Sequence, residues 1–381
     1  MRRHLLVTND FPPKVGGIQN YLWDLWSRLD PASFVVLTAS SDAAAAAFDA
    51  AQAERGIRIE RVPRPILFLP TVGAGNAVRR CVAEYRIDLV VFDPALPLGL
   101  LGLRIGVPYG VVLHGAEVTV PGRLPGSRAV LRRVLDGAAL IVSAGAYPAA
   151  EARRAAPALT AQVVEVPPGV DATAVIPLKA PERRAARVKQ GLPTHGPLVV
   201  SVSRLVPRKG MDVLIEAANR LAPSYPDLTL AIAGDGRERG RLDRLAARST
   251  VDVKVLGRVS DDDRASLLGA ADVFVMACRN RWLGLEQEGF GIVFLEAAAA
   301  GVPQIAGASG GAPEAVLHGV TGLVVDHPDD PGEVAEALRA LLADPTRRRR
   351  MGRAARTRVA ESFDTGVLAS RLADALAGVA I

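Results

Sequence analysis

Residues 288–307 read EGFGIVFLEAAAAGVPQIAG, and this stretch shows the repeating pattern from which the fold can be inferred. A glycine-rich turn leads into an apolar segment of helical length, Gly301 ends that segment, and an apolar run from Val302 to Ala306 follows. Short Val-, Ile- or Leu-rich runs that alternate with helical patterns and Gly or Pro turns are typical of βα units. We therefore expect a helix that begins near Gly291 and a buried strand at 302–306.

The same pattern recurs along the chain in two series of similar length. The first series predicts strands at 4–8, 34–38, 57–62, 88–92, 109–113, 140–143 and 163–166. A charged, proline-containing and strand-poor stretch follows from Pro168 to about Gly196. The second series predicts strands at 197–203, 228–233, 251–256, 272–276, 302–306 and 322–325. Two such series predict an α/β protein of two Rossmann-like domains that face each other across a cleft, with a hinge between the series.

Length and composition agree with this fold class. The 381 residues are roughly two to three times the length of one domain. Apolar residues make up 49% of the chain and aromatic residues only 4%, which favours helices on buried parallel strands over an all-β sandwich. This apolar fraction also excludes global disorder.

The formal charge of +6 comes from 46 Lys and Arg against 40 Asp and Glu. An anionic partner is consistent with this charge, and a composition biased toward arginine is the alternative explanation. Cys81 and Cys278 lie far apart without a CxxC pairing, so neither a disulfide framework nor a zinc site is indicated. We expect a cytoplasmic protein without a signal peptide or transmembrane helix, because the apolar runs are short or interrupted.

Two features in the first half lie at the ends of predicted strands. Gly16 and Gly17 separate the first strand from a helix, where backbone N–H groups can approach an anion. An ordinary tight turn is the alternative, and the missing GxGxxG pattern disfavours a nicotinamide dehydrogenase. His114 ends the fifth strand at the edge where α/β sheets bind ligands, with Glu117 close behind to orient it.

The second series opens with SVSRLVPRKG, residues 201–210, directly after a predicted strand. Arg204, Arg208 and Lys209 therefore cluster at the carboxyl end of that strand. A guanidinium offers a planar fork to phosphate oxygens and an ammonium offers a point charge, so the cluster can hold a diphosphate without a metal. A solvated basic loop is the alternative.

Two glutamates flank the helix expected after Gly291. Glu288 precedes this helix, where the neighbouring glycines leave backbone N–H groups for a sugar hydroxyl or a phosphate. Glu296 lies within the apolar helix, where a carboxylate needs a partner. Ribose hydroxyls would serve, and an internal salt bridge is the alternative.

Asp261, Asp262 and Asp263 form the one acidic run that suggests a metal. They follow Ser260 at the start of a helical pattern, where acidic side chains favour the helix dipole. We therefore interpret them as a helix cap, and no other spacing of His, Cys and carboxylates matches a metal motif.

The glutamates form an E-x7-E motif, and the whole chain resembles the retaining glycosyltransferases of family 4, which have the GT-B fold. Within this family, the strongest similarity is to the actinobacterial phosphatidylinositol monomannoside mannosyltransferases that use GDP-mannose. The stretches that carry it are VTNDFPPKVGGIQNYL (7–22), SRLVPRKG (203–210) and EGFGIVFLEAAAAGVPQIAGASGGAPEAV (288–316).

The resemblance implies an acceptor domain at 1–172, a donor domain at 173–360 and a C-terminal helix at 361–381 that crosses back to the first domain. It implies a metal-independent, retaining transfer of mannose from GDP-mannose to a phosphatidylinositol mannoside. No cofactor is expected, because the nucleotide sugar is a substrate. A protein nucleophile is not expected either, and the leaving phosphate acts as the base.

The resemblance also implies roles for individual residues. Arg204 and Lys209 would neutralise the diphosphate, Glu288 would hold sugar hydroxyls, and His114 would contact the sugar near its reacting carbon. These four residues form the expected catalytic set. The expected donor site consists of Gly16, Gly17, Arg204, Lys209, Val259, Asp261, Arg264, Glu288, Gly289, Phe290, Gly291 and Glu296.

The acceptor side departs from the family pattern. The mannosyltransferases carry HGHEVGW after the fifth strand, whereas residues 114–120 here read HGAEVTV. A basic segment, RLPGSRAVLRR (123–133), and aromatic residues in the first helix suit an anionic membrane interface on the inner face of the plasma membrane. A solvated basic face beside core aromatics is the alternative. The residues expected at the membrane or acceptor are Arg123, Arg128, Arg132, Arg133, Trp23 and Trp26.

Three other functions compete with this prediction. The same fold could use a UDP-sugar or a soluble acceptor, and it could be a non-catalytic nucleotide-sugar binding protein. A nucleic-acid partner is not expected, because no recognised module is present. The arginine-rich run at 347–358 is interpreted as a solvated helix. The sequence does not determine the base of the donor or the oligomeric state.

Overall fold

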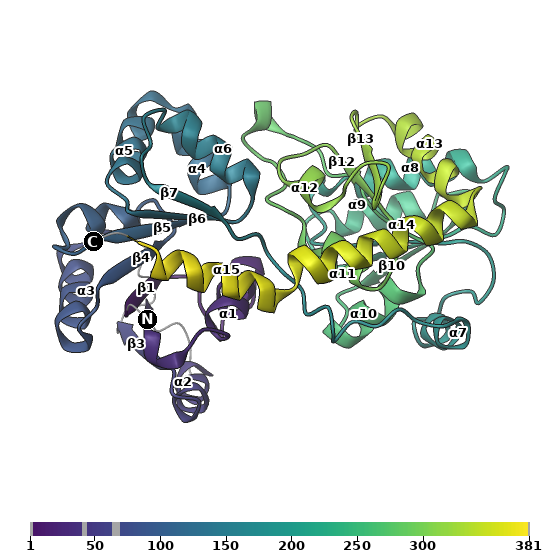
Figure 1. The fold of residues 1–381 in the computed structure, drawn as a ribbon. Helices are drawn as coiled ribbons and strands as arrows, with labels where there is room; N and C mark the ends of the chain where they lie inside the picture. Colours follow the sequence, from purple (N-terminus) through teal and green to yellow (C-terminus); the bar gives the residue numbers. More distant parts are fainter. Residues whose placement is uncertain (1–2, 40–43, 63–68, 380–381) are drawn as a thin grey trace. The chain divides into compact units, whose positions relative to one another are not determined.

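The computed structural model describes residues 3–39, 44–62 and 69–379. The chain divides into two compact units: unit 1 comprises residues 1–169 and 365–381, and unit 2 comprises residues 170–364 (Figure 1). The chain passes between the units at 169–170 and at 364–365, whereas the boundaries expected from the sequence are 172 and 360. Each unit is a parallel α/β layer structure, which confirms the predicted pair of Rossmann-like domains.

Unit 1 is built on a seven-stranded parallel sheet in the order β3-β2-β1-β4-β5-β6-β7. The strands are β1 (His4–Thr8), β2 (Phe34–Ala39), β3 (Arg58–Val62), β4 (Leu89–Asp93), β5 (Tyr109–Leu113), β6 (Leu140–Ser143) and β7 (Gln162–Glu165). The helices are α1 (Gly17–Trp26), α2 (Ala44–Glu54), α3 (Val72–Tyr85), α4 (Ala116–Arg123), α5 (Pro125–Asp136), α6 (Ala146–Ala155) and α15 (Thr365–Ala377), with 3-10 turns η1 (Pro31–Ser33) and η2 (Leu98–Arg104).

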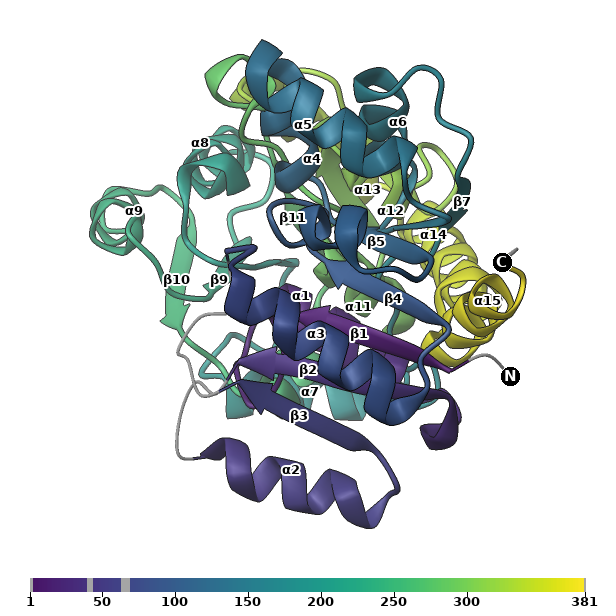
Figure 2. The same cartoon turned by 90° about the vertical axis from the view of Figure 1, so that its left-hand side faces the viewer.

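Both faces of the unit 1 sheet are covered, and the middle residues of its central strands are apolar. Successive residues of a strand point to opposite faces. Leu5 and Val7 contribute to the core under α3, η2 and α5, and Figure 2 shows α3 lying across β1 and β2. Leu6 contributes to the core of the other face, which α1 and α15 cover.

The last helix of the described chain, α15, belongs to unit 1, as predicted. Leu368 and Leu372 are fully buried and pack with Leu22 and Trp26 of α1. Residues from opposite ends of the sequence therefore complete one hydrophobic core.

Unit 2 contains a six-stranded parallel sheet in the order β10-β9-β8-β11-β12-β13. Its strands are β8 (Leu198–Val202), β9 (Thr229–Ala233), β10 (Asp252–Gly257), β11 (Val273–Met276), β12 (Gln304–Gly307) and β13 (Gly322–Val325). Its helices are α7 (Ala180–Lys189), α8 (Met211–Leu221), α9 (Arg239–Ala246), α10 (Asp261–Ala270), α11 (Ile292–Ala299), α12 (Ala312–Ala315), α13 (Pro331–Leu342) and α14 (Pro345–Arg358). Short helical turns are η3 (Pro207–Lys209), η4 (Trp282–Gly284) and η5 (Val359–Phe363).

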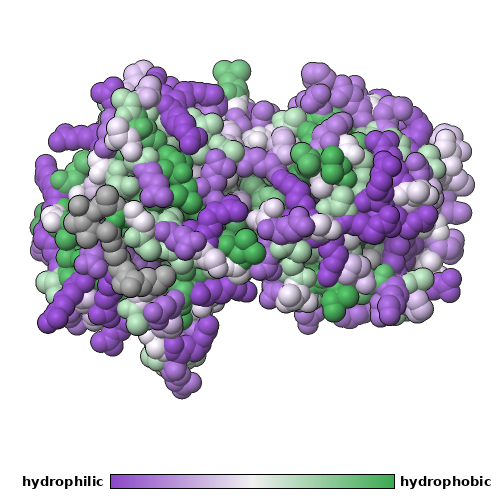
Figure 3. Space-filling model, in the orientation of Figure 1, coloured by the Kyte–Doolittle hydropathy of each residue, from purple (hydrophilic) through white to green (hydrophobic). Residues whose placement is uncertain are grey.

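The unit 2 sheet also lies between two apolar layers. One layer contains α8 and α13, and the other contains α10, α11 and residues of α14. The arginine-rich run lies in α14, where Arg349, Arg350 and Arg353 are exposed, and Figure 3 shows hydrophilic residues along this helix. α7 occupies part of the stretch expected to be poor in strands.

The strand order changes direction between β1 and β4 in unit 1 and between β8 and β11 in unit 2. Open α/β sheets bind ligands outside the carboxyl ends of the strands at such switch points. Several expected site residues follow these strands: Gly16 and Gly17 follow β1, Arg204 and Lys209 follow β8, and Glu288 follows β11. Within the described residues, no helix is long and apolar enough to cross a bilayer.

Candidate functional site

A buried ion pair lies at the switch point of unit 2. Lys209, in the turn after β8, donates to Glu288 Oε2 from Nζ at 2.6 Å. Glu288 lies in the loop between β11 and α11, and the two residues are only 7% and 6% exposed. β8 and β11 are neighbours in the sheet, so two turns 79 residues apart in sequence meet here.

Positive charge surrounds the Glu288 carboxylate. Burial favours its protonated form, but the charges of Lys209, Arg208 and Arg204 outweigh burial and lower the pKa of Glu288 below its ordinary value. Arg208 Nε lies 3.9 Å from Glu288 Oε2, and Arg208 Nη1 lies 3.5 Å from Glu286 Oε1. Arg204 is exposed. The arrangement favours the ionised form of Glu288, whose carboxylate oxygens can accept hydrogen bonds.

Two glycine-rich turns support the backbone beside Glu288. The Glu288 N–H donates to Ser309 Oγ at 3.1 Å, and the Gly311 N–H donates to the Glu288 carbonyl at 3.1 Å. Gly310 has a φ of 51°, and a Cβ there would lie 1.9 Å from the Glu288 carbonyl oxygen. Only glycine therefore permits this close approach.

The turn at residues 288–291 leads into α11 as the sequence predicts. Gly291 is the N-cap residue with a φ of 86°, and α11 begins at Ile292. The first backbone N–H groups of a helix lack intrahelical acceptors and favour anionic or hydroxyl ligands. Gly289 and Phe290 precede this N-terminus, and the Phe290 ring is buried in the unit 2 core.

Glu296 has a partner in the structure. Arg264 Nη2 lies 3.0 Å from Glu296 Oε1, and Arg264 Nη1 lies 3.0 Å from Asp261 Oδ1. Burial raises the pKa of Glu296, and the Arg264 charge opposes this effect without cancelling it. This salt bridge is the alternative that the sequence left open. Val259, in the turn before α10, packs against the unit 2 core that contains Phe290.

The acidic run at the start of α10 forms a helix cap. Ser260 is the N-cap residue, and its hydroxyl oxygen accepts from the Asp263 N–H at 3.1 Å. Asp263 also pairs with Lys189 at 2.7 Å. Among the residues that the structure describes, no group of three or more His, Cys, Asp or Glu side chains could hold a metal ion.

In unit 1, the paired glycines begin the helix after β1. Gly16 is the N-cap residue of α1 and Gly17 its first residue. A Cβ on Gly17 would contact nothing within 4 Å, so this backbone is open to a ligand. The preceding loop is fixed by Lys14, which donates to the Asn9 carbonyl at 2.9 Å.

His114 follows β5 and is held by a carboxylate that the sequence analysis did not identify. His114 Nε2 lies 2.5 Å from Asp93 Oδ1, and the Thr8 hydroxyl donates to Asp93 Oδ2 at 2.6 Å. Burial lowers the pKa of His114, but the charge and hydrogen bond of Asp93, with the charges of Glu117 and Asp10, raise it overall. The contact with Asp93 therefore stabilises the imidazolium form relative to that of a free histidine.

Glu117 has a different role from the one expected. Its Oε1 accepts from the backbone N–H groups of His114 at 2.5 Å and Gly115 at 3.0 Å. Glu117 therefore orders the loop at the start of α4, whereas Asp93 orients the imidazole ring. A sequence signal for Asp93 exists, because it is the acidic residue that ends the apolar run LVVFD at the sheet edge.

The structure divides the predicted membrane residues into different environments. The prediction that Trp26 lies at the membrane or acceptor is wrong. Trp26 is fully buried in the core, and its Nε1 donates to His4 Nε2 at 3.0 Å. The Trp23 ring packs edge-on against Phe11 and Phe48. The four predicted arginines also lie in different environments. Arg123 pairs with Glu151, and Arg128 donates to the Arg154 carbonyl. Arg132 and Arg133 are exposed on α5.

The predicted donor residues of unit 2 therefore gather at the ends of β8 and β11 and the starts of α10 and α11. The unit 1 residues gather at the ends of β1, β4 and β5. Three residues near the site are not predicted from the sequence. Asp93 contacts His114, Ser309 contacts Glu288, and Glu286 contacts Arg208. Ser309 and Glu286 lie in loops, where no helix or strand periodicity in the sequence marks them.

Comparisons with known protein families agree with the two units. Residues 182–358 match the family described as glycosyl transferases group 1. Residues 15–174 match the family described as Glycosyltransferase Family 4.

Two curated relatives match nearly the whole chain. A GDP-mannose-dependent monoacylated alpha-(1-6)-phosphatidylinositol monomannoside mannosyltransferase from Corynebacterium glutamicum is 39% identical and covers 98% of both chains. A GDP-mannose-dependent alpha-(1-6)-phosphatidylinositol monomannoside mannosyltransferase from Mycobacterium tuberculosis is 41% identical and covers 99% of both chains.

Solved structures share the fold at low sequence identity. HepE from Anabaena, in complex with UDP, has a TM-score of 0.81 at 21% identity and covers 99% of this chain and 100% of its own. Sucrose-phosphate synthase from Thermosynechococcus elongatus has a TM-score of 0.77 at 23% identity and covers 99% and 98%.

Proposed function

Because this chain belongs to the family 4 glycosyltransferases and is a hexosyltransferase, we propose that it transfers mannose from GDP-mannose to a phosphatidylinositol mannoside. The observation that carries this proposal is the 39–41% identity over essentially the full length of the two mannosyltransferases. We further propose that the transfer retains the anomeric configuration, needs no metal, and takes place at the membrane surface where the lipid acceptor lies.

The basic cluster of unit 2 supports a metal-independent reaction. In the proposed reaction, Lys209, Arg208 and Arg204 contact the donor diphosphate and stabilise the negative charge that develops as it leaves. Lys209 is held in place by Glu288 before the donor binds, so little reorganisation is required. Fixed cations at this position supply the charge neutralisation that a divalent ion supplies in other enzymes.

The carboxylates have separate proposed roles. Glu288 and the N–H groups at the start of α11 bind hydroxyl groups of the hexose. Glu296 binds the ribose hydroxyls once Arg264 yields part of its contact, and the backbone near Val259 meets the base. Gly16 and Gly17 approach the diphosphate, and His114 contacts the transferred sugar.

The proposed chemical step needs no protein nucleophile. The acceptor hydroxyl oxygen attacks the anomeric carbon on the face from which the diphosphate departs. The bond between that carbon and the diphosphate oxygen breaks, and its electron pair remains on the diphosphate. The same diphosphate oxygen takes the proton of the acceptor hydroxyl, which leaves GDP and the mannosylated lipid. Glu288 is a poor nucleophile because Lys209 and Arg208 stabilise its carboxylate.

The test is a transfer assay with the purified full-length chain. We expect transfer from GDP-mannose to a phosphatidylinositol monomannoside, no loss of rate in EDTA, and an α-linked product by NMR. Parallel reactions contain UDP-glucose, or a soluble sugar in place of the lipid. Preference for the UDP-sugar or the soluble acceptor would overturn the substrate assignment. A β-linked product or loss of activity in EDTA would overturn the mechanism.

A further inference from the structure

The loop between β11 and Glu288 contains a pair of residues that the proposed reaction does not use. Arg281 and Glu286 form an antiparallel backbone bridge: the Arg281 N–H donates to the Glu286 carbonyl at 2.9 Å, and the Glu286 N–H donates to the Arg281 carbonyl at 3.2 Å. Their side chains are joined as well, because Arg281 Nη1 donates to Glu286 Oε2 at 2.9 Å. We refer to Arg281 and Glu286 as the clasp.

The clasp closes the turn that contains η4, and the backbone of this turn is strained. Trp282 and Leu283 have φ values of 50° and 54°, in the left-handed region that residues other than glycine rarely adopt. Trp282 is 61% exposed and Leu283 is fully exposed, so burial of these side chains offsets little of the strain. The clasp opposes the strain through its own contacts, and the Arg281 guanidinium also lies 4.9 Å from the centroid of the Trp282 ring.

The clasp also reaches the basic cluster of unit 2. Glu286 Oε2 accepts from Arg281, whereas Glu286 Oε1 lies 3.5 Å from Arg208 Nη1. The side chains of Glu286 and Arg208 are 19% and 18% exposed, so solvent screens their attraction only in part. The Arg279 N–H donates to the Arg208 carbonyl at 2.8 Å, which joins the backbones of the loops after β8 and β11. The strained turn is therefore connected to a cation of the candidate donor site.

The Arg208 guanidinium lies between two carboxylates and still has donors to offer. Its distances of 3.5 Å to Glu286 and 3.9 Å to Glu288 are long for charge-assisted hydrogen bonds. Within the described parts of the chain, the buried Nε of Arg208 has no hydrogen-bond partner. A buried donor without a partner is unfavourable unless a ligand satisfies it. The two carboxylates thus restrict where Arg208 points and leave its N–H groups for phosphate oxygens.

From these contacts we propose that Glu286 is a positioning residue: it holds the Arg208 guanidinium toward the donor phosphate that carries the hexose, and Arg281 holds Glu286. This inference rests on the proposed function, in which Arg208 contacts the donor diphosphate and Glu288 binds hexose hydroxyls. Because Arg208 is a neighbour of Glu288, the phosphate within its reach is the one attached to the hexose. Glu286 does not contact the donor and acts through Arg208.

The test compares the binding of GDP and GMP to the full-length chain by isothermal titration calorimetry. GMP lacks the phosphate that carries the hexose, so it lacks the partner of Arg208. We expect E286Q and R208Q each to weaken GDP binding about fivefold or more, and to leave GMP binding unchanged. The double variant R208Q/E286Q should bind GDP as R208Q does, because Glu286 acts only through Arg208. E286D keeps a carboxylate near Arg208 and should recover part of the GDP affinity.

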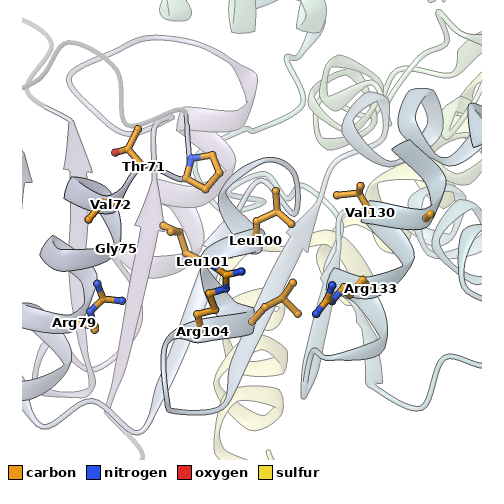
Figure 4. A pocket seen from close by; sticks show the side chains of 12 residues that line it. Thr71, Val72, Gly75, Arg79, Leu100, Leu101, Arg104, Val130 and Arg133 are labelled. Carbon is orange, nitrogen blue, oxygen red and sulfur yellow. The ribbon is translucent and has the colours of Figure 1, made fainter. Parts of the chain in front are cut away.

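Charge-matched controls separate positioning from general electrostatics. Glu216→Gln removes an exposed carboxylate from α8. Arg104→Gln removes an exposed guanidinium from η2 of unit 1, where Arg104 lines a groove between α3 and α5 (Figure 4). Both variants should bind GDP and GMP like the original chain. The inference is wrong if E286Q weakens GDP and GMP binding equally, if only R208Q weakens GDP binding, or if the two losses add in the double variant.

Failure of the proposed function gives a different result. Normal GDP binding by R208Q would show that Arg208 does not contact the diphosphate, which overturns the assigned role of Arg208 and with it the inference. If the original chain binds UDP and not GDP, the guanine donor is wrong, and the same comparison made with UDP and UMP decides the role of Glu286.

Trp282 provides a second readout. Arg281 contacts both Glu286 and the Trp282 ring, so a shift of the clasp on donor binding should alter the environment of this ring. GDP should therefore change the tryptophan fluorescence of the original chain, and Trp282→Phe should abolish that change, which assigns it to this residue rather than to Trp23 or Trp26 of α1. In E286Q, saturating GDP should leave the fluorescence unchanged. A full fluorescence change in E286Q or in Trp282→Phe would contradict the coupling through the clasp.

Discussion

At the scale of single residues, Lys209 and Glu288 form an ion pair within a buried environment. Replacement of Lys209 by Met leaves the carboxylate buried, with the more distant Arg208 and Arg204 as its remaining cationic neighbours. We expect a loss of about 3 kcal/mol in the free energy of unfolding and a fall of about 10²-fold or more in kcat/KM. Urea unfolding and the transfer assay measure these two effects.

The double variant K209M/E288Q provides the control for this pair. It removes both charges, so it should recover much of the stability while remaining inactive. Because the pKa of Glu288 is lowered in the folded state, the pair stabilises the protein fully above pH 4.5 and loses this effect as the pH falls through the lowered value. A double variant as unstable as K209M would contradict the predicted cost of an unpaired buried carboxylate.

Asp93 is a second residue whose charge controls a neighbour. Asp93→Asn should lower the pKa of His114, because burial then acts on the imidazolium with less opposition. NMR titration of the imidazole measures the pKa, and Thr8→Val is the control that removes only a neutral hydroxyl from Asp93. A His114 pKa unchanged in Asp93→Asn would contradict the assigned contact.

The stability effect of Asp93→Asn follows from the same contact. The raised pKa of His114 means that this contact contributes fully below pH 6.5 and is lost as the pH rises through the raised value. We therefore expect a loss of about 2 kcal/mol at pH 5.5 that shrinks in alkaline solution.

The sequence indicates which charged residues follow the strands, but it does not indicate which partners they contact. Glu288, Lys209 and His114 were found because charged residues at strand ends are conspicuous in an apolar background. Their contacts with Ser309, Asp93 and Arg208 depend on which strands become neighbours, and β1, β4 and β5 bring together residues more than 20 positions apart. Trp26 was misassigned because an aromatic residue in an amphipathic helix has the same pattern whether it faces a core or a membrane.

At the scale of elements, the turn at residues 309–311 positions the loop that carries Glu288 through a backbone contact. Gly310→Ala places a Cβ against the Glu288 carbonyl and should cost about 1–3 kcal/mol beyond the cost of a positive φ. Gly319→Ala is the matched control, because Gly319 also has a positive φ of 77° but a Cβ there would have nothing within 4 Å. That variant should lose about 1–2 kcal/mol.

Donor affinity distinguishes a local disturbance from a general loss of stability. Calorimetric titration with the nucleotide sugar should show weaker binding for Gly310→Ala and unchanged binding for Gly319→Ala. Equal affinities in the two variants would show that the turn does not position the loop that carries Glu288 for donor binding.

Strand positions were predicted closely, and the exceptions have local causes. The run at Val302 predicts the start of a strand, but β12 begins at Gln304 because the Val302 N–H donates to the Ala297 carbonyl and still belongs to the end of α11. η2 was not predicted, because its glycines matter through their close contacts with Val134 and Tyr109, which a linear pattern does not contain. α7 lies in the stretch that was described only by its charge and prolines.

At the scale of the whole molecule, α15 completes the core of unit 1 from the far end of the sequence. Leu372→Ala should destabilise unit 1 by about 2–5 kcal/mol, because Leu372 is fully buried. Val367→Ala, on the same helix at a side chain that is 40% exposed, should change stability by about 0.5 kcal/mol or less.

Differential scanning calorimetry can assign the loss to one unit. In Leu372→Ala, the transition of unit 1 should move to lower temperature while that of unit 2 stays in place. A shift confined to the unit 2 transition would contradict the assignment of α15 to unit 1.

The α/β class and the two series of strands could be predicted because buried parallel strands are apolar on both faces and leave a strong signal. The return of the last helix to unit 1 followed from family resemblance. Its amphipathic pattern identifies an apolar face but does not say which sheet that face covers.

Unit 2 is inserted within unit 1, and the ends of this insertion lie side by side: the Val170 N–H donates to the Phe363 carbonyl at 3.0 Å, and Val170 pairs with Asp364. During synthesis on the ribosome, unit 2 therefore has all its strands before unit 1 has its final helix. The apolar face that α15 covers stays open until residues 365–377 have emerged. The N-terminal unit is thus the last to finish folding. A nascent chain stalled before residue 365 would expose the apolar face of unit 1 that α15 otherwise covers, and chaperones bind exposed apolar surface of this kind.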